Sequence, residues 1–310
     1  MDSARRNANL VLMLAAAIWG FAFVAQRVGM RHLGPLTFNG IRFGLGALAL
    51  TPLLIYNLRK QRIVGDLNEN SATGKAPNKQ PSRAFCLRAG LLTGLLIFGG
   101  STFQQFGVVY TTAGKAGFIT SLYVVFVPIL GLLTGQGTGR WTWWGALLAA
   151  IGLYLLSIRG WMSIDLGDGL VLIGALFWAS HVLAVGKLSG RIDPIRLAVS
   201  QFIVCSLLSL LGALIFESFQ WPAIRAAAVP ILYAGILSVG VAYTLQLVGQ
   251  RHAQPAHAAI ILSFEAVYAV IGGWLILNEG LTPRAMIGCA LMLAGVFLAQ
   301  RESGPRDSAV

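Results

Sequence analysis

The chain has 310 residues, of which 56% are hydrophobic and only 11% are charged, and its mean hydropathy is +0.72. A soluble globular domain carries about 25% charged residues, so this composition excludes one and indicates a polytopic membrane protein. The formal net charge of +12 does not point to nucleic acid, because the basic residues lie mostly in short polar segments beside apolar stretches, where the positive-inside bias explains them.

Cys86, Cys205 and Cys289 lie far apart and show no paired spacing. Metal sites and redox motifs place their ligands at short, fixed intervals, so we expect no metal ion and no cofactor, and we interpret the three cysteines as packing residues.

Arg5 and Arg6 precede an apolar stretch with three consecutive alanines, a pattern similar to a signal peptide. The stretch continues to about Met30, which is longer than the apolar region of a signal peptide, so it is interpreted as a retained first span. Similar stretches of about 17 to 25 residues predict ten membrane-spanning helices in all. They cover residues 10–30, 36–58, 89–110, 113–134, 143–160, 169–188, 195–216, 226–249, 255–277 and 284–300.

The distribution of basic residues predicts the orientation of these spans. With the N-terminus inside, sixteen of the 23 Lys and Arg residues fall in cytoplasmic segments. Only five face outside, namely Arg31, Lys115, Arg159, Arg225 and Arg284. The pattern predicts a multi-pass membrane protein with both termini in the cytoplasm; the membrane is expected to be the bacterial inner membrane.

The longest polar segment covers residues 59–87 and is rich in Lys, Arg, Asn, Ser and Pro. It has too little apolar surface to form a core, so we predict a flexible cytoplasmic linker. Attraction of its basic residues to anionic lipid headgroups is the alternative.

The sequence also contains an internal repeat. Equivalent residues of the two copies differ in residue number by one of two constant values, which we call the longer and the shorter offset. The longer offset aligns Trp19, Pro35 and Phe43 with Trp178, Pro194 and Phe202. The shorter offset aligns Gln104, Gly107, Ala116 and Ser121 with Gln246, Gly249, Ala258 and Ser263. With one residue added to the shorter offset, Gly145, Gly152 and Leu155 align with Gly288, Gly295 and Leu298.

These offsets predict two five-span repeats, residues 1–160 and 161–310. Because five is odd, the second repeat enters the membrane from the opposite side, which is the inverted construction of many secondary transporters. Their substrate sites lie near the membrane midplane between the repeats. The offset changes because only the first repeat contains the 59–87 segment.

Several motifs, in register with the repeat, resemble the EamA family of the drug/metabolite transporter superfamily. They are Ile18-Trp19-Gly20-Phe21-Ala22-Phe23-Val24, Ile41-Arg42-Phe43, Ser263-Phe264-Glu265, Asn278-Glu279-Gly280-Leu281-Thr282 and the segment from Gly288 to Gly295. The resemblance covers about residues 10–300. It implies two five-helix repeats and gradient-linked movement of small metabolites, often amino acid export.

The sequence departs from the family pattern in two places. Gln136-Gly137-Thr138 stands where the first repeat commonly has a glutamate, which puts a symmetrical role of Glu279 in doubt. Ala266 replaces the proline that often follows the glutamate of the ninth span, so we expect no proline kink beside Glu265.

Glu265 lies near the middle of the predicted span 255–277, where an acidic side chain costs about 2.5 to 3.5 kcal/mol on insertion scales. In a helix it shares a stripe with His257, Ile261 and Tyr268. A carboxyl group in a partly dry cavity takes up a proton more readily than in water, so we predict Glu265 as the coupling and substrate-binding group. The alternative is a buried pair that only joins two helices.

Aromatic and imidazole side chains are further candidates for a substrate cavity. Trp19 and Phe23 continue into Gln26 as one mixed stripe, and Trp178 and His181 share a face of the sixth span. Aromatic walls suit substrates with apolar or cationic parts, and an imidazole can donate, accept or titrate. The alternatives are helix packing for the aromatic residues and an interhelical hydrogen bond for His181.

Gln104 and Gln246 occupy equivalent positions, and Tyr243 joins Gln246 on one face at a spacing of three residues. Amides can hold a carboxylate or an amino group, and they equally well link helices. Tyr123 is the repeat equivalent of Glu265 and is the group that we expect to face it. Aromatic core packing is the alternative for Tyr123.

Other charged residues are interpreted as structural. Lys115 begins the fourth span, where we expect it to extend to the outer surface, with attraction of an anionic substrate as the alternative. Arg27 is also expected to extend outward. Arg42 cannot lose its proton, so we expect it to bind carbonyl groups or helix ends. Glu279, with Thr282, is expected to cap the tenth span.

The predicted function is secondary transport by alternating access, with export of small metabolites such as amino acids. The alternative substrates are larger amphipathic drugs and nucleotide-linked or lipid-like compounds. An enzyme is not expected, because the sequence has no acidic metal cluster and its Cys and His residues are dispersed. A non-transporting membrane protein is the remaining alternative. The expected partners are a small-molecule substrate and membrane lipid, with a homodimer left open.

Overall fold

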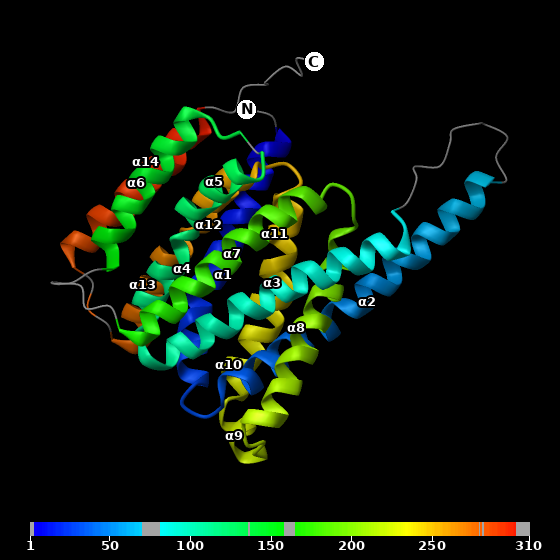
Figure 1. Cartoon of the computed structure of the whole chain (residues 1–310), viewed down its shortest axis with the longest axis horizontal. Helices are drawn as coiled ribbons and strands as arrows, with labels where there is room; N and C mark the ends of the chain where they lie inside the picture. Colours follow the sequence, from blue (N-terminus) through cyan, green and yellow to red (C-terminus); the bar gives the residue numbers. More distant parts are fainter. Residues whose placement is uncertain are drawn as a thin grey trace.

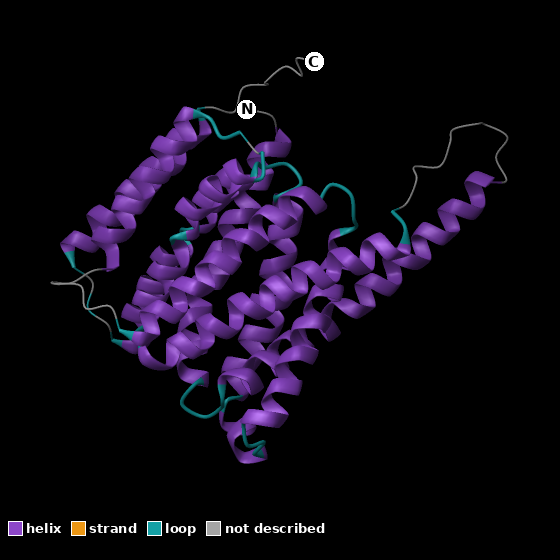
Figure 2. Cartoon of the chain, viewed as in Figure 1, coloured by secondary structure: helices purple, strands orange, loops and turns teal. Residues whose placement is uncertain are grey.

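The computed structural model describes residues 3–69, 81–135, 137–157, 165–278, 280 and 282–301. The regular elements of these residues are all helical (Figure 2). They are α1 (Ser3–Gly29), α2 (Pro35–Glu69), α3 (Arg83–Tyr110), α4 (Ala113–Ser121), α5 (Tyr123–Leu133), α6 (Arg140–Ser157), α7 (Leu166–Leu188), α8 (Pro194–Phe216), α9 (Trp221–Ala226), α10 (Ala228–Leu232), the π-helix η1 (Tyr233–Ala242), α11 (Tyr243–Gly249), α12 (Pro255–Leu262), α13 (Glu265–Leu277) and α14 (Pro283–Gln300).

Eight stretches of the described chain are long and apolar enough to span a membrane, by length and composition. They are Arg6–Gly29, Pro35–Lys60, Arg83–Tyr110, Ala113–Leu133, Leu166–Leu188, Pro194–Phe216, Ala228–Gly249 and Pro255–Leu277. The other two predicted spans, 143–160 and 284–300, fall on α6 and on α14, which has a shorter apolar stretch, Met286–Ala299. The prediction of an all-α, multi-pass membrane protein is therefore confirmed.

The helices form one bundle in which segments distant in sequence lie side by side (Figure 1). The first residues of α1 and the last of α14 lie at the same end of the bundle (Figure 1). Helices α6 and α14 pack along each other, and small residues permit the approach: Gly145 lies against Gly295, and Gly152 against Gly288.

The prediction of a linker over residues 59–87 is wrong at both ends. Helix α2 continues to Glu69, and α3 begins at Arg83. The start of this segment is rich in Lys, Arg, Gln, Leu and Glu, which are good helix formers by intrinsic preference. Ser82 caps α3 by accepting a hydrogen bond from the Phe85 amide at 3.2 Å. Residues 70–80 lie outside the described residues.

The fourth and ninth predicted spans are each broken in the middle. The first break is at Leu122, whose amide donates to the Ile119 carbonyl three residues back at 3.2 Å. The second is at Ser263 and Phe264, and the Phe264 amide donates to Ile261 at 3.2 Å. Ser263 and Phe264 keep right-handed helical backbone angles, so the chain through Glu265 remains one span, Pro255–Leu277, and no proline lies beside Glu265. The breaks fall at positions that the shorter offset of the repeat relates, and Tyr123 and Glu265 begin the second half-helices.

The eighth predicted span also departs from a regular α-helix, because residues Tyr233–Ala242 form a π-helix between α10 and α11. Such segments are rare and occur frequently at functional sites. The equivalent part of α3 is regular, so the two halves of the chain differ here.

Two basic side chains expected to extend outward make internal contacts instead. Arg27 donates from Nη1 to the carbonyl oxygens of Val108 and Val109, at 2.6 and 3.0 Å. These carbonyls belong to the last turn of α3, which lacks partners within its own helix. Lys115 forms an ion pair with Asp168 at 2.5 Å. Glu279 and Gln136 lie outside the described residues.

Candidate substrate-binding cavity

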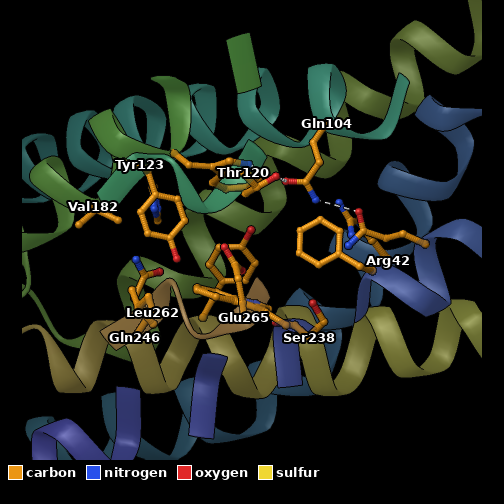
Figure 3. A pocket seen from close by; sticks show the side chains of 15 residues that line it. Arg42, Gln104, Thr120, Tyr123, Val182, Ser238, Gln246, Leu262 and Glu265 are labelled. Atoms are coloured by element: carbon orange, nitrogen blue, oxygen red, sulfur yellow. Dashed lines mark hydrogen bonds between the residues drawn. The ribbon is translucent and has the colours of Figure 1, made fainter. Parts of the chain in front are cut away.

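A cavity lined by buried side chains lies between α4, α5, α12 and α13 on one side and α1, α2, α3, α7, η1 and α11 on the other. Its empty volume is about 500 Å³, a value that includes adjoining open solvent. All nine predicted site residues line it: Trp19, Phe23, Gln104, Tyr123, Trp178, His181, Tyr243, Gln246 and Glu265. Gln26, expected on the same stripe as Trp19 and Phe23, also lines it, whereas the sequence prediction missed five further lining residues: Arg42, Thr120, Val182, Ser238 and Leu262. Figure 3 shows nine of the fifteen labelled around one space.

Helical spacing explains why most of these residues meet. Trp19, Phe23 and Gln26 follow one another at steps of four and three on α1, so they share one face. Tyr243 and Gln246 repeat the step of three on α11. His257 and Tyr268 do not line the cavity, because the break at Ser263 and Phe264 interrupts the stripe expected on one continuous helix.

Glu265 is 4% exposed and is the first residue of α13. Ser121 Oγ donates to the carbonyl oxygen of Ser263 at 3.3 Å and lies 3.5 Å from Oε1 of Glu265. The ion pairs of the described chain do not include this glutamate. A carboxylate in an apolar environment without a cationic partner is strongly disfavoured, so the position favours a bound proton or a bound cation.

Tyr123 enters the cavity from the wall opposite Glu265 (Figure 3). Its hydroxyl lies close enough to the Glu265 carboxyl to interact, but not in the geometry of a full hydrogen bond. Tyr123 and Glu265 thus line the same cavity, and a role of Tyr123 as the partner of the glutamate stays a prediction. Its hydroxyl can complete its hydrogen bonding with a ligand or a water molecule.

Arg42 lines the same cavity and is 3% exposed. Its guanidinium carbon lies 5.0 Å from the Phe43 ring centroid and 5.5 Å from that of Phe38, so both rings stabilise the charge from α2 itself. Among the described residues its Nε has no hydrogen-bond partner. The expectation that Arg42 binds carbonyl groups or helix ends therefore does not hold for its Nε atom.

Gln104 is the centre of the best-connected polar network in the cavity. Its Nε2 donates to Gln26 Oε1 at 2.9 Å, and its Oε1 accepts from Trp178 Nε1 at 2.8 Å and from Thr120 Oγ1 at 3.4 Å. Its repeat equivalent Gln246 is only 1% exposed, yet its Oε1 has no partner among the described residues. The two amides therefore have different environments: Gln104 binds three side chains from other helices, whereas Gln246 presents a free acceptor.

Tyr243 is the centre of the aromatic wall. Its ring centroid lies 4.7 Å from that of Trp19, 6.1 Å from those of Trp178 and His181, and 5.6 Å from that of Phe202. Trp19 is held by its Nε1, which donates to the carbonyl oxygen of Ser238 in the π-helix at 3.1 Å. The wall is therefore a set of mutually contacting aromatic rings tied to the π-helix by one hydrogen bond.

His181 is 1% exposed, and its Nε2 lies 3.1 Å from Oε1 of Gln201 on α8. This is the interhelical hydrogen bond left open as the alternative for the residue. Because the same ring lines the cavity, both readings hold in part. In the described residues, no group of three or more His, Cys, Asp or Glu side chains is arranged to hold a metal ion.

Three polar atoms of the cavity lining are available to a ligand or to water. Buried polar groups in native proteins are nearly always hydrogen-bonded, and each exception calls for an explanation. Tyr123 Oη, Gln246 Oε1 and Arg42 Nε are buried without partners among the described residues, and all three side chains face one cavity. A substrate or water that fills the cavity would satisfy them.

Comparison with known proteins agrees with this fold. The model of the EamA-like transporter family matches residues 6–158 and 165–300. An uncharacterized transporter of Archaeoglobus fulgidus is 30% identical over 95% of this chain and 86% of its own length. The threonine/homoserine exporter RhtA of Escherichia coli K12 is 25% identical over 152 residues, which is 48% of this chain and 50% of that protein.

A solved crystal structure superimposes with a TM-score of 0.71 and 18% sequence identity, and the match covers 96% of this chain and 99% of the other. At 18% sequence identity, the match is evidence for the fold alone. The resemblance predicted from the sequence motifs is confirmed by the family match, which covers both halves. The chain belongs to the EamA-like transporter family.

Proposed function

We propose that this chain is a secondary transporter that exports small zwitterionic metabolites, amino acids in particular, by alternating access. The observation that carries the proposal is the pair of opposite charges in one buried cavity. Arg42 and Glu265 both line it, and the ion pairs of the described chain do not join them to each other or to another residue.

Such a cavity suits a molecule that carries both charges. A substrate carboxylate can accept hydrogen bonds from the guanidinium of Arg42, which offers five donors in a planar fork. A substrate ammonium group can take the place of a proton beside Glu265, where Tyr123 adds a further polar group. The aromatic wall around Tyr243 would pack against the substrate's carbon atoms. Export of threonine and homoserine by the relative RhtA supports this substrate class.

We propose that ten spans form two inverted repeats, residues 1–160 and 161–310, in a bacterial inner membrane, with both termini in the cytoplasm. Two glycine contacts support the repeats, because the two offsets of the sequence relate one contact to the other. They are Gly107 against Gly167 and Val171, and Gly249 against Ala8 and Leu12. The common end of α1 and α14 in the bundle supports an even number of spans (Figure 1).

We further propose that Glu265 couples transport to the proton gradient. A buried carboxyl group can bind either a proton or a cationic substrate group, and competition between the two links export to proton entry. The family and the named relatives are transporters, and we propose no catalysed reaction for the chain.

Competition in proteoliposomes tests the substrate class. The protein is reconstituted with radiolabelled threonine and an excess of one unlabelled compound together inside, and efflux of the label is measured. Free threonine should compete, whereas its methyl ester, which lacks the carboxylate, and its N-acetyl derivative, which lacks the ammonium group, should compete at least about tenfold less well. Equal competition by all three, or competition only by large amphipathic compounds, would contradict a zwitterion site.

Matched variants connect the assay to the two charges. Arg42→Gln should remove the advantage of the free acid over the ester. Glu217→Gln is the control, because that glutamate lies outside the cavity, where it accepts the Leu36 and Thr37 amides at 2.8 Å each. A glutamine there can still accept one of these bonds, so selectivity should be unchanged.

A further inference from the structure

An ion pair joins the starts of α4 and α7 at one end of the bundle. Lys115 Nζ lies 2.5 Å from Asp168 Oδ2 and 3.8 Å from Asp165 Oδ2. The side chain of Asp168 is only 5% exposed, and its Oδ1 also accepts a hydrogen bond from Thr111 Oγ1 at 3.0 Å. The contact is therefore charge-assisted, partly buried and supported by a second hydrogen bond.

A second contact joins α12 to α1. Nε2 of His257, on the first turn of α12, lies 3.2 Å from Oδ1 of Asn9, near the start of α1. His257 is 5% exposed and Asn9 is partly buried. This contact is a hydrogen bond between an imidazole and an amide.

The two contacts are equivalent under the internal repeat. The shorter offset relates Lys115 to His257, and the longer offset relates Asn9 to Asp168. None of these four residues is among the aligned residues from which the two offsets were identified. The same pair of positions is therefore in contact twice, and each time one partner comes from residues 1–160 and the other from residues 161–310.

The two contacts lie at opposite ends of the cavity. Arg27, near the end of α1, bonds the carbonyls of Val108 and Val109 just before Lys115, which places Lys115 at that end of the helix. Asn9 lies five helical turns earlier on α1, or about 27 Å at a rise of about 1.5 Å per residue. That separation is close to the roughly 30 Å thickness of the hydrocarbon core. The cavity residues Trp19 and Phe23 lie between the two ends.

We infer that the Lys115–Asp168 and Asn9–His257 contacts are the two gates of the cavity, one for each face of the membrane. The inference rests on the proposed alternating-access function. In an inverted repeat, the rotation that superimposes one half on the other exchanges the two faces of the membrane. Equivalent contacts between the halves therefore have the same role at opposite membrane faces. When the halves rock against each other, one contact opens while the other closes.

Neighbouring contacts at the same two ends of the bundle each join residues of the same half of the chain. Arg27 bonds Val108 and Val109, and Arg251 donates to the carbonyl oxygens of Ser189 and Ile192 at 2.8 and 3.0 Å. Rocking of one half against the other leaves such contacts unchanged. They are therefore matched controls: they involve basic side chains at the same ends but do not join the halves.

Thiol accessibility from the two faces tests the gates. Ser238→Cys places a reporter on the cavity lining in a background from which Cys86, Cys205 and Cys289 have been removed. A membrane-impermeant thiol reagent is then applied to right-side-out and to inside-out vesicles. Lys115→Gln should raise the labelling rate from the Lys115 face at least about fivefold, the lower end of typical couplings between conformational states, and lower it from the other face. Asn9→Ala should do the reverse.

Four further variants make the result specific. Lys115→Arg keeps the charge and should label like the parent. Asn9→Asp copies the equivalent residue Asp168 and should strengthen the second gate, so labelling from the Asn9 face should fall. Arg27→Gln and Arg251→Gln should leave both rates unchanged. Gate variants that label like these controls, or a Lys115→Gln variant that opens toward the Asn9 face, would overturn the inference. Labelling needs no substrate, so absence of transport would count against the proposed function alone.

Discussion

The hydroxyl of Ser121 donates a hydrogen bond to the carbonyl oxygen of Ser263 at 3.3 Å, and the two serines are equivalent under the shorter offset of the repeat. Each serine stands immediately beside the break in its own helix. The two broken helices therefore meet at their equivalent points, and this meeting places Tyr123 and Glu265 next to each other in the cavity.

Removal of the Ser121 hydroxyl tests the importance of this crossing. Ser121→Ala should lower stability by about 0.6 kcal/mol, the typical value for a hydrogen bond between helices in a membrane, and should lower the transport rate. Thermal unfolding in detergent and efflux from proteoliposomes measure the two effects. Thr93→Ala is the control, because that buried hydroxyl bonds only carbonyls of its own helix, at 2.8 and 3.4 Å. If both variants transport equally, the crossing has no special role.

The equivalent glutamines Gln104 and Gln246 should respond differently to the same change. Gln104→Leu leaves Trp178 Nε1, Gln26 Oε1 and Thr120 Oγ1 without a partner, and should lower the free energy of unfolding by about 1–3 kcal/mol for each group that stays unpaired. Gln246→Leu removes an oxygen that has no partner among the described residues, so its stability should change less while its KM for substrate rises. The reverse ranking would contradict the assignment of a structural amide and a ligand-facing amide.

Helix packing between α6 and α14 should be sensitive to one added methyl group. A side chain at Gly152 would press against the carbonyl oxygen of Gly288 and against Met292, so Gly152→Ala should destabilise the protein by about 1–3 kcal/mol. Gly169→Ala on α7 meets no atom within 4 Å and should be neutral or slightly stabilising, since alanine favours a helix. Melting temperatures of the two variants in one detergent make the comparison.

The aromatic wall should determine affinity for the substrate's carbon skeleton. Tyr243→Ala removes ring contacts with Trp19, Trp178 and Phe202 and opens a void beside the cavity. Its KM should rise for amino acids with apolar side chains more than for glycine, whereas Tyr243→Phe should retain most of the affinity. A uniform loss for every substrate in both variants would indicate a packing role instead.

Much of the candidate site was predictable from the sequence, because the repeat and the helical period together determine which residues share a face. Glu265 was identified as a costly acid in an apolar span, and the shorter offset then identified Tyr123 as its counterpart. Gln104, Gln246, Trp19 and Trp178 followed from the register of the repeat. All of them line one cavity.

The helix breaks were not predictable from local signals. Breaks usually follow proline or glycine, but Leu122, Ser263 and Phe264 carry no such signal, and the local geometry is a tight turn imposed by the crossing of two helices. Arg42 was missed as a cavity residue because an arginine inside a span was interpreted as a structural residue that binds carbonyl groups or helix ends.

The central claim is that Glu265 links substrate export to proton entry, and proton-driven efflux tests it most directly. Proteoliposomes loaded with radiolabelled threonine are diluted into a buffer more acidic than their interior. The wild-type protein should release threonine faster than at equal pH, whereas Glu265→Gln, which carries no titratable group there, should show no acceleration. Full acceleration by the acidic buffer in Glu265→Gln would contradict the account.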